Sequence, residues 1–240
     1  MLKPKPYLRS INLKDGYDAE SYPFTIPAVA GLDGLSFHED VTFFVGENGS
    51  GKSTVLEAIA LAMGFGAQGG TKNVLMDDAG GLSGLHNWLK VKKSYDHPSD
   101  GYFLRAESFY NVASYMDVAG YLQGYGGQSL HQQSHGESFM ATLLNKFKGK
   151  GFYLMDEPEA ALSPARQLAA LVRINDLVEK DSQFIIATHS PILLAYPRAK
   201  IMIFDTDGIY EVKYEQTEHF SITRDFLNNY PKRLEQLLSD

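Results

Sequence analysis

The chain has 240 residues and no cysteine, which excludes disulfides and thiolate zinc sites and suits a reducing cytoplasm. Basic residues are in the minority: 22 Lys and Arg against 29 Asp and Glu leave a net charge of −7, which argues against a strongly electrostatic DNA-binding surface. No apolar run approaches the roughly 20 residues of a membrane helix, and the first residues lack the apolar core of a signal peptide. We therefore expect a cytoplasmic protein with no direct membrane insertion.

Glycine is plentiful in one stretch, residues 45–54, Val-Gly-Glu-Asn-Gly-Ser-Gly-Lys-Ser-Thr. It fits the pattern Gly, four residues, Gly, Lys, Ser or Thr, and it lies between an apolar run, residues 41–45, and a helical pattern. Such glycines let backbone N–H groups point at phosphate oxygens. We expect Lys52 to contact the β and γ phosphates and Ser53 to hold Mg²⁺. The predicted nucleotide-binding residues of this loop are Glu47, Asn48, Gly49, Ser50, Gly51, Lys52, Ser53 and Thr54.

A second motif, residues 151–158, consists of apolar residues that end in two carboxylates, Asp156 and Glu157. It predicts a buried parallel strand that delivers both acids to the C-terminal edge of a sheet. We expect Asp156 to bind Mg²⁺, directly or through water, and Glu157 to accept a proton from an attacking water. A further strand, 183–187, precedes His189, which could hydrogen-bond the γ phosphate or that water, although a lone histidine is more often structural.

In this order the motifs resemble those of ABC-type ATPases, whose fold serves transporter motors and chromosome-maintenance and repair ATPases. Ser134 and Gly136 stand at the family's customary distance before Asp156, in the place of its signature motif, whereas His135 and Glu137 depart from that motif. The resemblance implies that Ser134 and Gly136 bind the γ phosphate held by a partner subunit, so that two chains sandwich two ATP molecules.

The segment before the signature separates branches of the family. The family's glutamine is absent from residues 104–108, where Glu107 or Ser108 could replace it. Residues 109–133 are too few for the helical subdomain of transporter motors, and no long coiled coil of the chromosome-maintenance type is present. The chain thus most resembles compact, stand-alone bacterial ATPases related to the repair group. The tyrosines of this segment form either a partner surface or the packed side of a small subdomain; they are Tyr110, Tyr115, Tyr121 and Tyr125.

Two further groups of side chains leave alternatives open. Tyr17, Tyr22 or Phe24 could stack on adenine, but aromatic residues in strands usually belong to the core. The lysines at positions 90, 92 and 93 form either a solvated strand face or a nucleic-acid contact.

We expect an α/β P-loop NTPase with a central, mainly parallel sheet, an antiparallel β subdomain and a reduced helical subdomain. It is a single domain, 1–240, made of a phosphate-loop lobe with the β subdomain (1–108), a short helical and signature region (109–150), the strands of the Asp-Glu and His motifs (151–215) and C-terminal helices (216–240). Residues 22–29 are expected to be extended. Two amphipathic helices, 221–230 and 231–238, are expected to cover a sheet edge.

The predicted activity is Mg²⁺-dependent hydrolysis of ATP to ADP and phosphate by an ATP-induced homodimer, with DNA maintenance as one role. Lys52, Glu157 and His189 are the catalytic candidates, and Ser53 and Asp156 the metal ligands. Adenine is favoured because the sequence has no Asn-Lys-x-Asp motif for guanine. One alternative is an ATP-gated sensor or clamp with slow hydrolysis that signals to a DNA or protein partner. The other is the motor subunit of a transporter.

Overall fold

The computed structural model describes residues 5–72, 82–109, 111–112, 114 and 133–239. Its main sheet has the strand order β5-β6-β7-β3-β8-β9. Neighbouring strands are parallel from β5 to β8, and β9 is antiparallel to β8. The strands are β3 Val41–Val45, β5 Asp100–Arg105, β6 Gly151–Asp156, β7 Gln183–Ala187, β8 Ala199–Asp205 and β9 Gly208–Val212. The predicted α/β fold with a mainly parallel sheet is confirmed.

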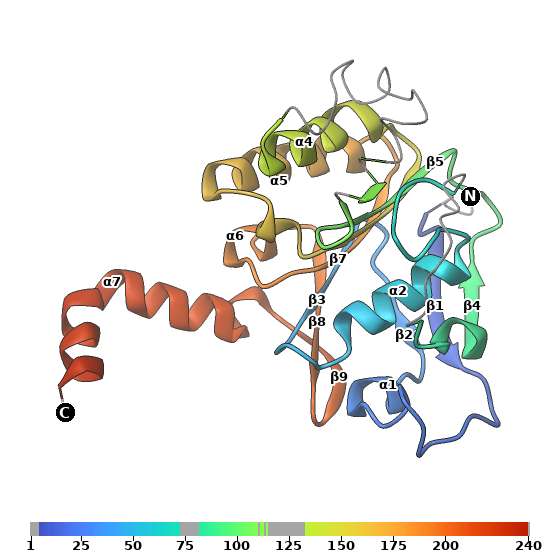
Figure 1. Ribbon diagram of the computed structural model, residues 1–240, viewed down its shortest axis with the longest axis horizontal. Coiled ribbons are helices and arrows are strands. Elements are labelled where there is room, and N and C mark those ends of the chain that lie inside the picture. The colour runs from blue at the N-terminus through green and yellow to red at the C-terminus, as the bar shows by residue number, and fades with distance from the viewer. Residues whose placement is uncertain (1–4, 73–81, 110, 113, 115–132, 240) are drawn as a thin grey trace.

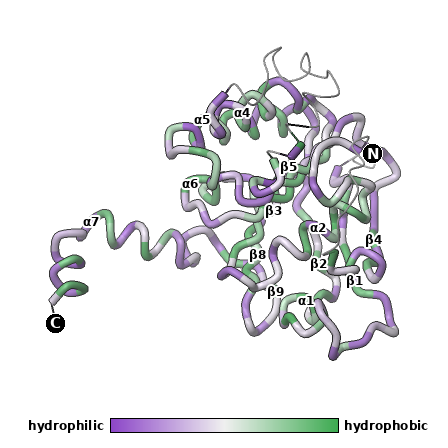
Figure 2. Tube along the Cα trace, viewed as in Figure 1, coloured by the Kyte–Doolittle hydropathy of each residue, from purple (hydrophilic) through white to green (hydrophobic). Residues whose placement is uncertain are grey.

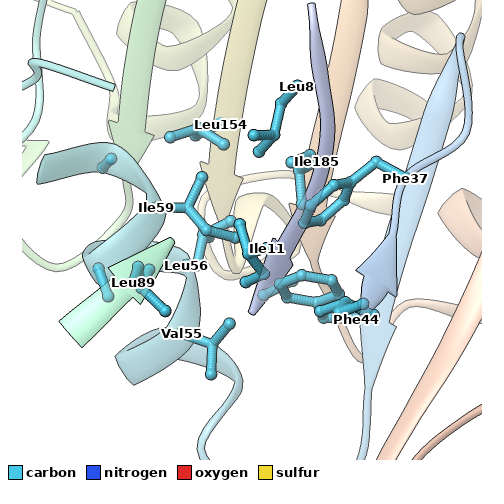
Figure 3. Close-up of a cluster of buried hydrophobic side chains, with 14 of the residues drawn as sticks. Leu8, Ile11, Phe37, Phe44, Val55, Leu56, Ile59, Leu89, Leu154 and Ile185 are labelled. Carbon is cyan, nitrogen blue, oxygen red and sulfur yellow. The ribbon is translucent and has the colours of Figure 1, made fainter. Parts of the chain in front are cut away.

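A separate antiparallel sheet, β2-β1-β4, lies on one side of the main sheet. Its strands are β1 Leu8–Leu13, β2 Leu35–Ser36 and β4 Leu89–Lys93, the last entered through the short turn η1 Leu85–Trp88. Helix α2 (Lys52–Ala62) packs between the two sheets. Its side chains Leu56 and Ile59 share one buried cluster with Ile11 of β1 and Ile185 of β7 (Figure 3). This packing fixes α2, and with it the loop that precedes α2, against the centre of the main sheet.

The opposite face of the main sheet is covered by helices (Figure 1). They are α4 His135–Ala141 with its extension η4 Thr142–Lys146, α5 Pro164–Val178 and α6 Pro191–Leu194. Successive side chains of a strand point to opposite faces of the sheet. Phe43 packs with the helices, whereas Phe44 packs in the cluster around α2. Burial on both faces explains why the central strands read as continuous apolar runs.

The C-terminal helix differs from its prediction. After η6 (Tyr214–Gln216), helix α7 (Glu218–Leu238) runs away from the body of the molecule and has no buried residue (Figure 1). A kink at the non-helical Asn229, two residues before Pro231, divides it into two helical parts close to the predicted boundary, but neither part covers a sheet edge. Apolar side chains on it, such as Leu227 and Leu237, are exposed. Figure 2 shows hydrophobic residues interspersed with hydrophilic ones along α7. An amphipathic pattern shows that a helix has an apolar face, but not what covers that face.

Two other local predictions need correction. Residues 22–29 are not extended, because the chain turns there and forms the short helix α1 (Pro27–Ala30), with Pro27 in its first turn. The second concerns residues 102–109, whose β-like composition predicts a strand to Phe109, whereas β5 ends at Arg105. Most of the tyrosine-rich segment, including Tyr110, Tyr115, Tyr121 and Tyr125, lies outside the described residues. Within the described ranges, no helix combines the length and the apolar character needed to cross a membrane.

Candidate functional site

The phosphate loop joins β3 to α2 at the C-terminal edge of the main sheet. Gly51, with a left-handed φ of 99°, caps α2, whose first N–H groups have no intrahelical acceptor and form an anion site. Lys52 is buried, and its Nζ donates to the carbonyl oxygens of Gly46 (2.7 Å) and Glu47 (2.8 Å). The ammonium thus lies within its own loop, where phosphate oxygens could replace the two carbonyls as its partners.

The first glycine of the phosphate loop lies too close to β8 to carry a side chain. Gly46 has a φ of 150°, and a Cβ there would lie 2.1 Å from the carbonyl oxygen of Phe204 in β8. The hydroxyl of Ser50 is buried in the loop and has no hydrogen-bond partner among the described residues. The buried Ser50 hydroxyl and the N-terminus of α2 are groups that could bind the phosphates of a nucleotide.

Ser53 at the start of α2 and Asp156 at the end of β6 form a hydrogen-bonded pair. The hydroxyl of Ser53 donates to Oδ1 of Asp156 at 3.0 Å. Burial raises the pKa of Asp156 to about 6, against the lowering effects of Arg105 and of the Ser53 hydrogen bond. A carboxylate that is costly to ionise in this position gains from a cation beside it. The oxygen donors fit Mg²⁺, which takes one or two protein ligands and completes its shell with phosphates and waters.

Arg105 is a member of the site that no motif indicated. Its Nη1 donates to Glu57 of α2 at 2.8 Å, and its Nε lies 3.6 Å from Oδ2 of Asp156. Strand pairing explains the contact, since Arg105 and Asp156 are direct neighbours in the β5–β6 register. In this structure the guanidinium partly balances the Asp156 charge.

Glu107 and Ser108, the two candidates to replace the missing glutamine, have different surroundings. Glu107 lines a small cavity of about 60 Å³ together with Ser53, Asp156 and Glu157, enough for roughly two water molecules. Ser108 instead donates its hydroxyl to the Gln68 carbonyl oxygen at 2.5 Å. Of the two candidates, only Glu107 lines this cavity, and a role for either residue in positioning Mg²⁺ stays a prediction.

Glu157 follows β6 in a left-handed conformation, φ 49° and ψ 52°, which is strained for a residue with a side chain and is typical of functional sites. Its Oε1 lies 3.7 Å from Nε2 of His189, which follows β7. Burial, and then the Lys52 charge, lower the pKa of His189, while Glu157 opposes them. The histidine ring is therefore neutral near pH ~7.

A buried carboxylate, Glu159, fixes the backbone that carries His189. It accepts hydrogen bonds from the Thr188 hydroxyl (2.7 Å) and from the backbone N–H of His189 (2.5 Å). Burial raises its pKa, although these two hydrogen bonds act in the opposite direction. The sequence alone does not indicate this role, because Glu159 follows β6 and its partners follow β7.

The signature residues lie on a different element, at the start of α4. Ser134 precedes the helix, and both its N–H and its hydroxyl donate to the Glu137 carboxylate, at 2.9 and 2.7 Å. A Cβ on Gly136 would lie 2.7 Å from the carbonyl oxygen of Ala161, in the loop after Glu157. The predicted site residues thus form two groups: the loop, the carboxylates and His189 come together, whereas Ser134 and Gly136 lie at the start of α4, where Gly136 packs on the loop after the carboxylates.

A larger cleft of about 1010 Å³ adjoins the phosphate loop. The loop residues 46–50 line one side, and the β8–β9 hairpin and the start of α7 line the other. Its volume is at the upper end of that of small-molecule sites. Of the aromatic candidates for adenine stacking, Phe24 is buried and stacks on Tyr17, with ring centroids 4.5 Å apart, whereas Tyr22 is exposed. Adenine stacking by any of the three stays a prediction.

Comparisons with known proteins bear on the fold of the chain. One family model, described as "AAA domain", matches residues 28–93, and another, described as "AAA domain, putative AbiEii toxin, Type IV TA system", matches residues 125–195. Among solved structures, cbiO1 from Clostridium perfringens, part of the ABC transporter complex cbiONQ, superposes with a TM-score of 0.51 at 16% identity, over 97% of this chain and 98% of that one. The chain has the fold of ABC-type P-loop ATPases.

Two further solved structures resemble this chain. The ADP form of MJ1267, an ATP-binding cassette of an ABC transporter, is 18% identical over 98% of this chain and 99% of that one, with a TM-score of 0.47. The SMC head domain from Thermotoga maritima is 18% identical over 86% of this chain and 98% of that one, with a TM-score of 0.45. A comparison with curated protein sequences gives no match.

Proposed function

We propose that the chain binds Mg²⁺–ATP and hydrolyses it to ADP and phosphate. The observation that carries this proposal is the meeting of Lys52, the hydrogen-bonded pair Ser53–Asp156 and the pair Glu157–His189 at one edge of the parallel sheet. Each group has a separate task in phosphoryl transfer, where positioning and charge stabilisation supply most of the rate enhancement.

The chemistry follows from the side chains present. Lys52 exchanges the carbonyls of Gly46 and Glu47 for β and γ phosphate oxygens. Ser53 and Asp156 hold Mg²⁺, which neutralises charge on the phosphates when bound. Glu157 accepts a proton from the attacking water, and His189 donates from Nε2 to a γ phosphate oxygen or to that water.

We also propose that a second copy of the chain completes the site. The support is the position of Ser134 and Gly136 at the start of α4, where Gly136 packs on the loop after Glu157 and the exposed Ser134 bonds Glu137 rather than the phosphate loop of the same chain. Closure of two chains over ATP would bring the start of α4 of each to the nucleotide of the other. A DNA or protein substrate for the closed dimer remains a prediction; Lys90, Lys92 and Lys93 are exposed on β4.

The test uses Glu157→Gln, with Glu20→Gln, an exposed site, as the matched control. The expected result is ATP binding as in the wild type, no turnover, and a mass by light scattering that doubles with ATP and Mg²⁺ but not without nucleotide. A variant that stays monomeric with ATP bound contradicts the dimer. Turnover at the wild-type rate contradicts Glu157 as the base.

One observation favours the ATP-gated sensor as a second candidate. The Ser134 hydroxyl is held by Glu137, a charged residue where the family has glutamine, and must leave it before it can bind a phosphate. Slow turnover by the purified chain that rises strongly on addition of a DNA or protein partner would support the sensor. Fast turnover by the chain alone would exclude it.

A further inference from the structure

The contacts of His189 continue beyond Glu157, to the C-terminal helix. Its Nδ1 lies 3.1 Å from Nε2 of His219, the second residue of α7, and the ring centroids are 5.2 Å apart. Its other nitrogen, Nε2, faces Glu157 at 3.7 Å. Three side chains from separate elements therefore form a line that ends at the proposed base.

His219 is held in place by contacts of its own turn. The buried Thr217 caps α7: its hydroxyl accepts from the Phe220 N–H at 3.3 Å and donates to the Tyr214 carbonyl oxygen at 2.7 Å. The Tyr214 hydroxyl in turn donates to the carbonyl oxygen of Pro191 at 2.7 Å. Pro191 lies two residues after His189, so the first turn of α7 is tied to the segment that carries the catalytic histidine.

The positions of the protons on the two histidine rings follow from the groups that the ring nitrogens face. Burial is the largest cause of the lowered pKa of both histidines, so each ring is neutral and has one donor and one acceptor nitrogen. The Glu157 carboxylate can only accept. His189 therefore carries its proton on Nε2, facing Glu157, and its Nδ1 accepts from the Nε2–H of His219. The opposite arrangement would aim a lone pair of His189 at the carboxylate.

The two ring nitrogens that lack a hydrogen-bond partner among the described residues agree with this assignment of protons. His189 Nε2 is buried and makes no hydrogen bond within the described residues, so its proton is available to an oxygen that enters the site. His219 Nδ1 is likewise buried without a hydrogen-bond partner in that part of the chain. The backbone of His189 is fixed by Glu159, and the contact with His219 fixes what remains free, the torsion of the ring.

We propose that His219 is a positioning residue of the ATPase, whose Nε2–H holds His189 in the tautomer and orientation that present Nε2–H to the γ phosphate or the attacking water. This inference rests on the proposed function, and it makes the first turn of α7 part of the hydrolytic site.

Turnover in the full-length chain gives the first test. His219→Leu keeps the bulk without a donor, whereas His219→Gln places an amide N–H near the position of Nε2. We expect kcat of the leucine variant to fall by about 10- to 100-fold, as for other residues that orient a functional histidine, with KM unchanged. The glutamine variant should keep most of kcat. The exposed His97→Leu serves as control.

The tautomer gives a readout that does not depend on turnover. In nucleotide-free protein with ¹⁵N-labelled histidine, the His189 signals, assigned by their loss in His189→Asn, should show protonation at Nε2. His219→Leu should abolish that preference. Protonation of His189 at Nδ1 in the wild type overturns the proposal, as does a leucine variant with wild-type kcat or a wild-type tautomer. Absence of turnover in the wild type would count against the proposed function alone, and the tautomer would still decide the role of His219.

Discussion

Replacing Asp156 by Asn should stabilise the metal-free, nucleotide-free protein above pH ~6, although it removes a group that the proposed chemistry requires. Burial raises the pKa of Asp156 from 3.8 to about 6, and each pH unit of difference corresponds to about 1.4 kcal/mol. The ionised carboxylate therefore costs about 3 kcal/mol of folding free energy. Asparagine keeps an oxygen that can accept from the Ser53 hydroxyl. The pKa of about 6 already includes the attraction to Arg105, so the variant should gain most of this free energy.

The sign of the pH dependence is fixed by which state holds the proton. The folded protein keeps the Asp156 proton to a higher pH than the unfolded chain, so the wild type loses stability as pH rises from about 3.8 to about 6 and is level above that. The asparagine variant has no such loss. Its advantage should thus be about 1 kcal/mol near pH ~4.5 and about 3 kcal/mol near pH ~8.

Urea unfolding in EDTA at both pH values measures this advantage. Asp176→Asn, at an exposed position of α5, is the matched control and should change the free energy of unfolding by less than about 0.5 kcal/mol at either pH. An Asp156→Asn protein no more stable than the wild type near pH ~8, or equally stabilised at both pH values, would refute the reasoning.

Three further outcomes are expected. Gly46→Ala should lower the free energy of unfolding by about 2 kcal/mol or more and weaken ATP binding, because its Cβ would lie 2.1 Å from the Phe204 carbonyl oxygen; wild-type values in urea unfolding and nucleotide titration would contradict this. Glu137→Gln should raise ATP turnover, because a neutral amide holds the Ser134 hydroxyl less strongly than a carboxylate; an unchanged rate at saturating ATP would show that this bond does not limit the site. Arg105→Met should destabilise the protein by about 2 kcal/mol or more, because it leaves Glu57 and Asp156 without their shared cation; removal of the Glu57 charge as well should recover part of the loss, and no recovery would contradict the cause.

The sequence was sufficient to predict the groups that follow buried strands. The apolar run that ends in Asp156 and Glu157 predicts a buried strand of a parallel sheet, and the glycine pattern before Lys52, between a strand and a helix, predicts a phosphate loop. The structure confirms the α/β fold and brings these groups together with His189. The two-faced burial of the strands also follows from their uniform apolar character.

Contacts that depend on strand order or on the placement of a distant helix could not be predicted in this way. Arg105 reaches Asp156 only because β5 lies beside β6, and nothing local to residues 100–105 indicates that neighbour. His219 meets His189 because Tyr214 and Thr217 tie the start of α7 to Pro191. The rest of α7 shows the same limit. Its apolar pattern correctly predicts helical structure, but the prediction that this structure covers a sheet edge is wrong.

The central claim is that Glu157 activates water for ATP hydrolysis at this site, and phosphate release measures it most directly. Purified wild type and Glu157→Gln are compared at saturating ATP with Mg²⁺ and with EDTA. The account predicts Mg²⁺-dependent release by the wild type and a loss of at least about 100-fold in the variant, consistent with removal of a general base, while ATP affinity is retained. Equal release by both proteins, or release that persists in EDTA, would contradict it.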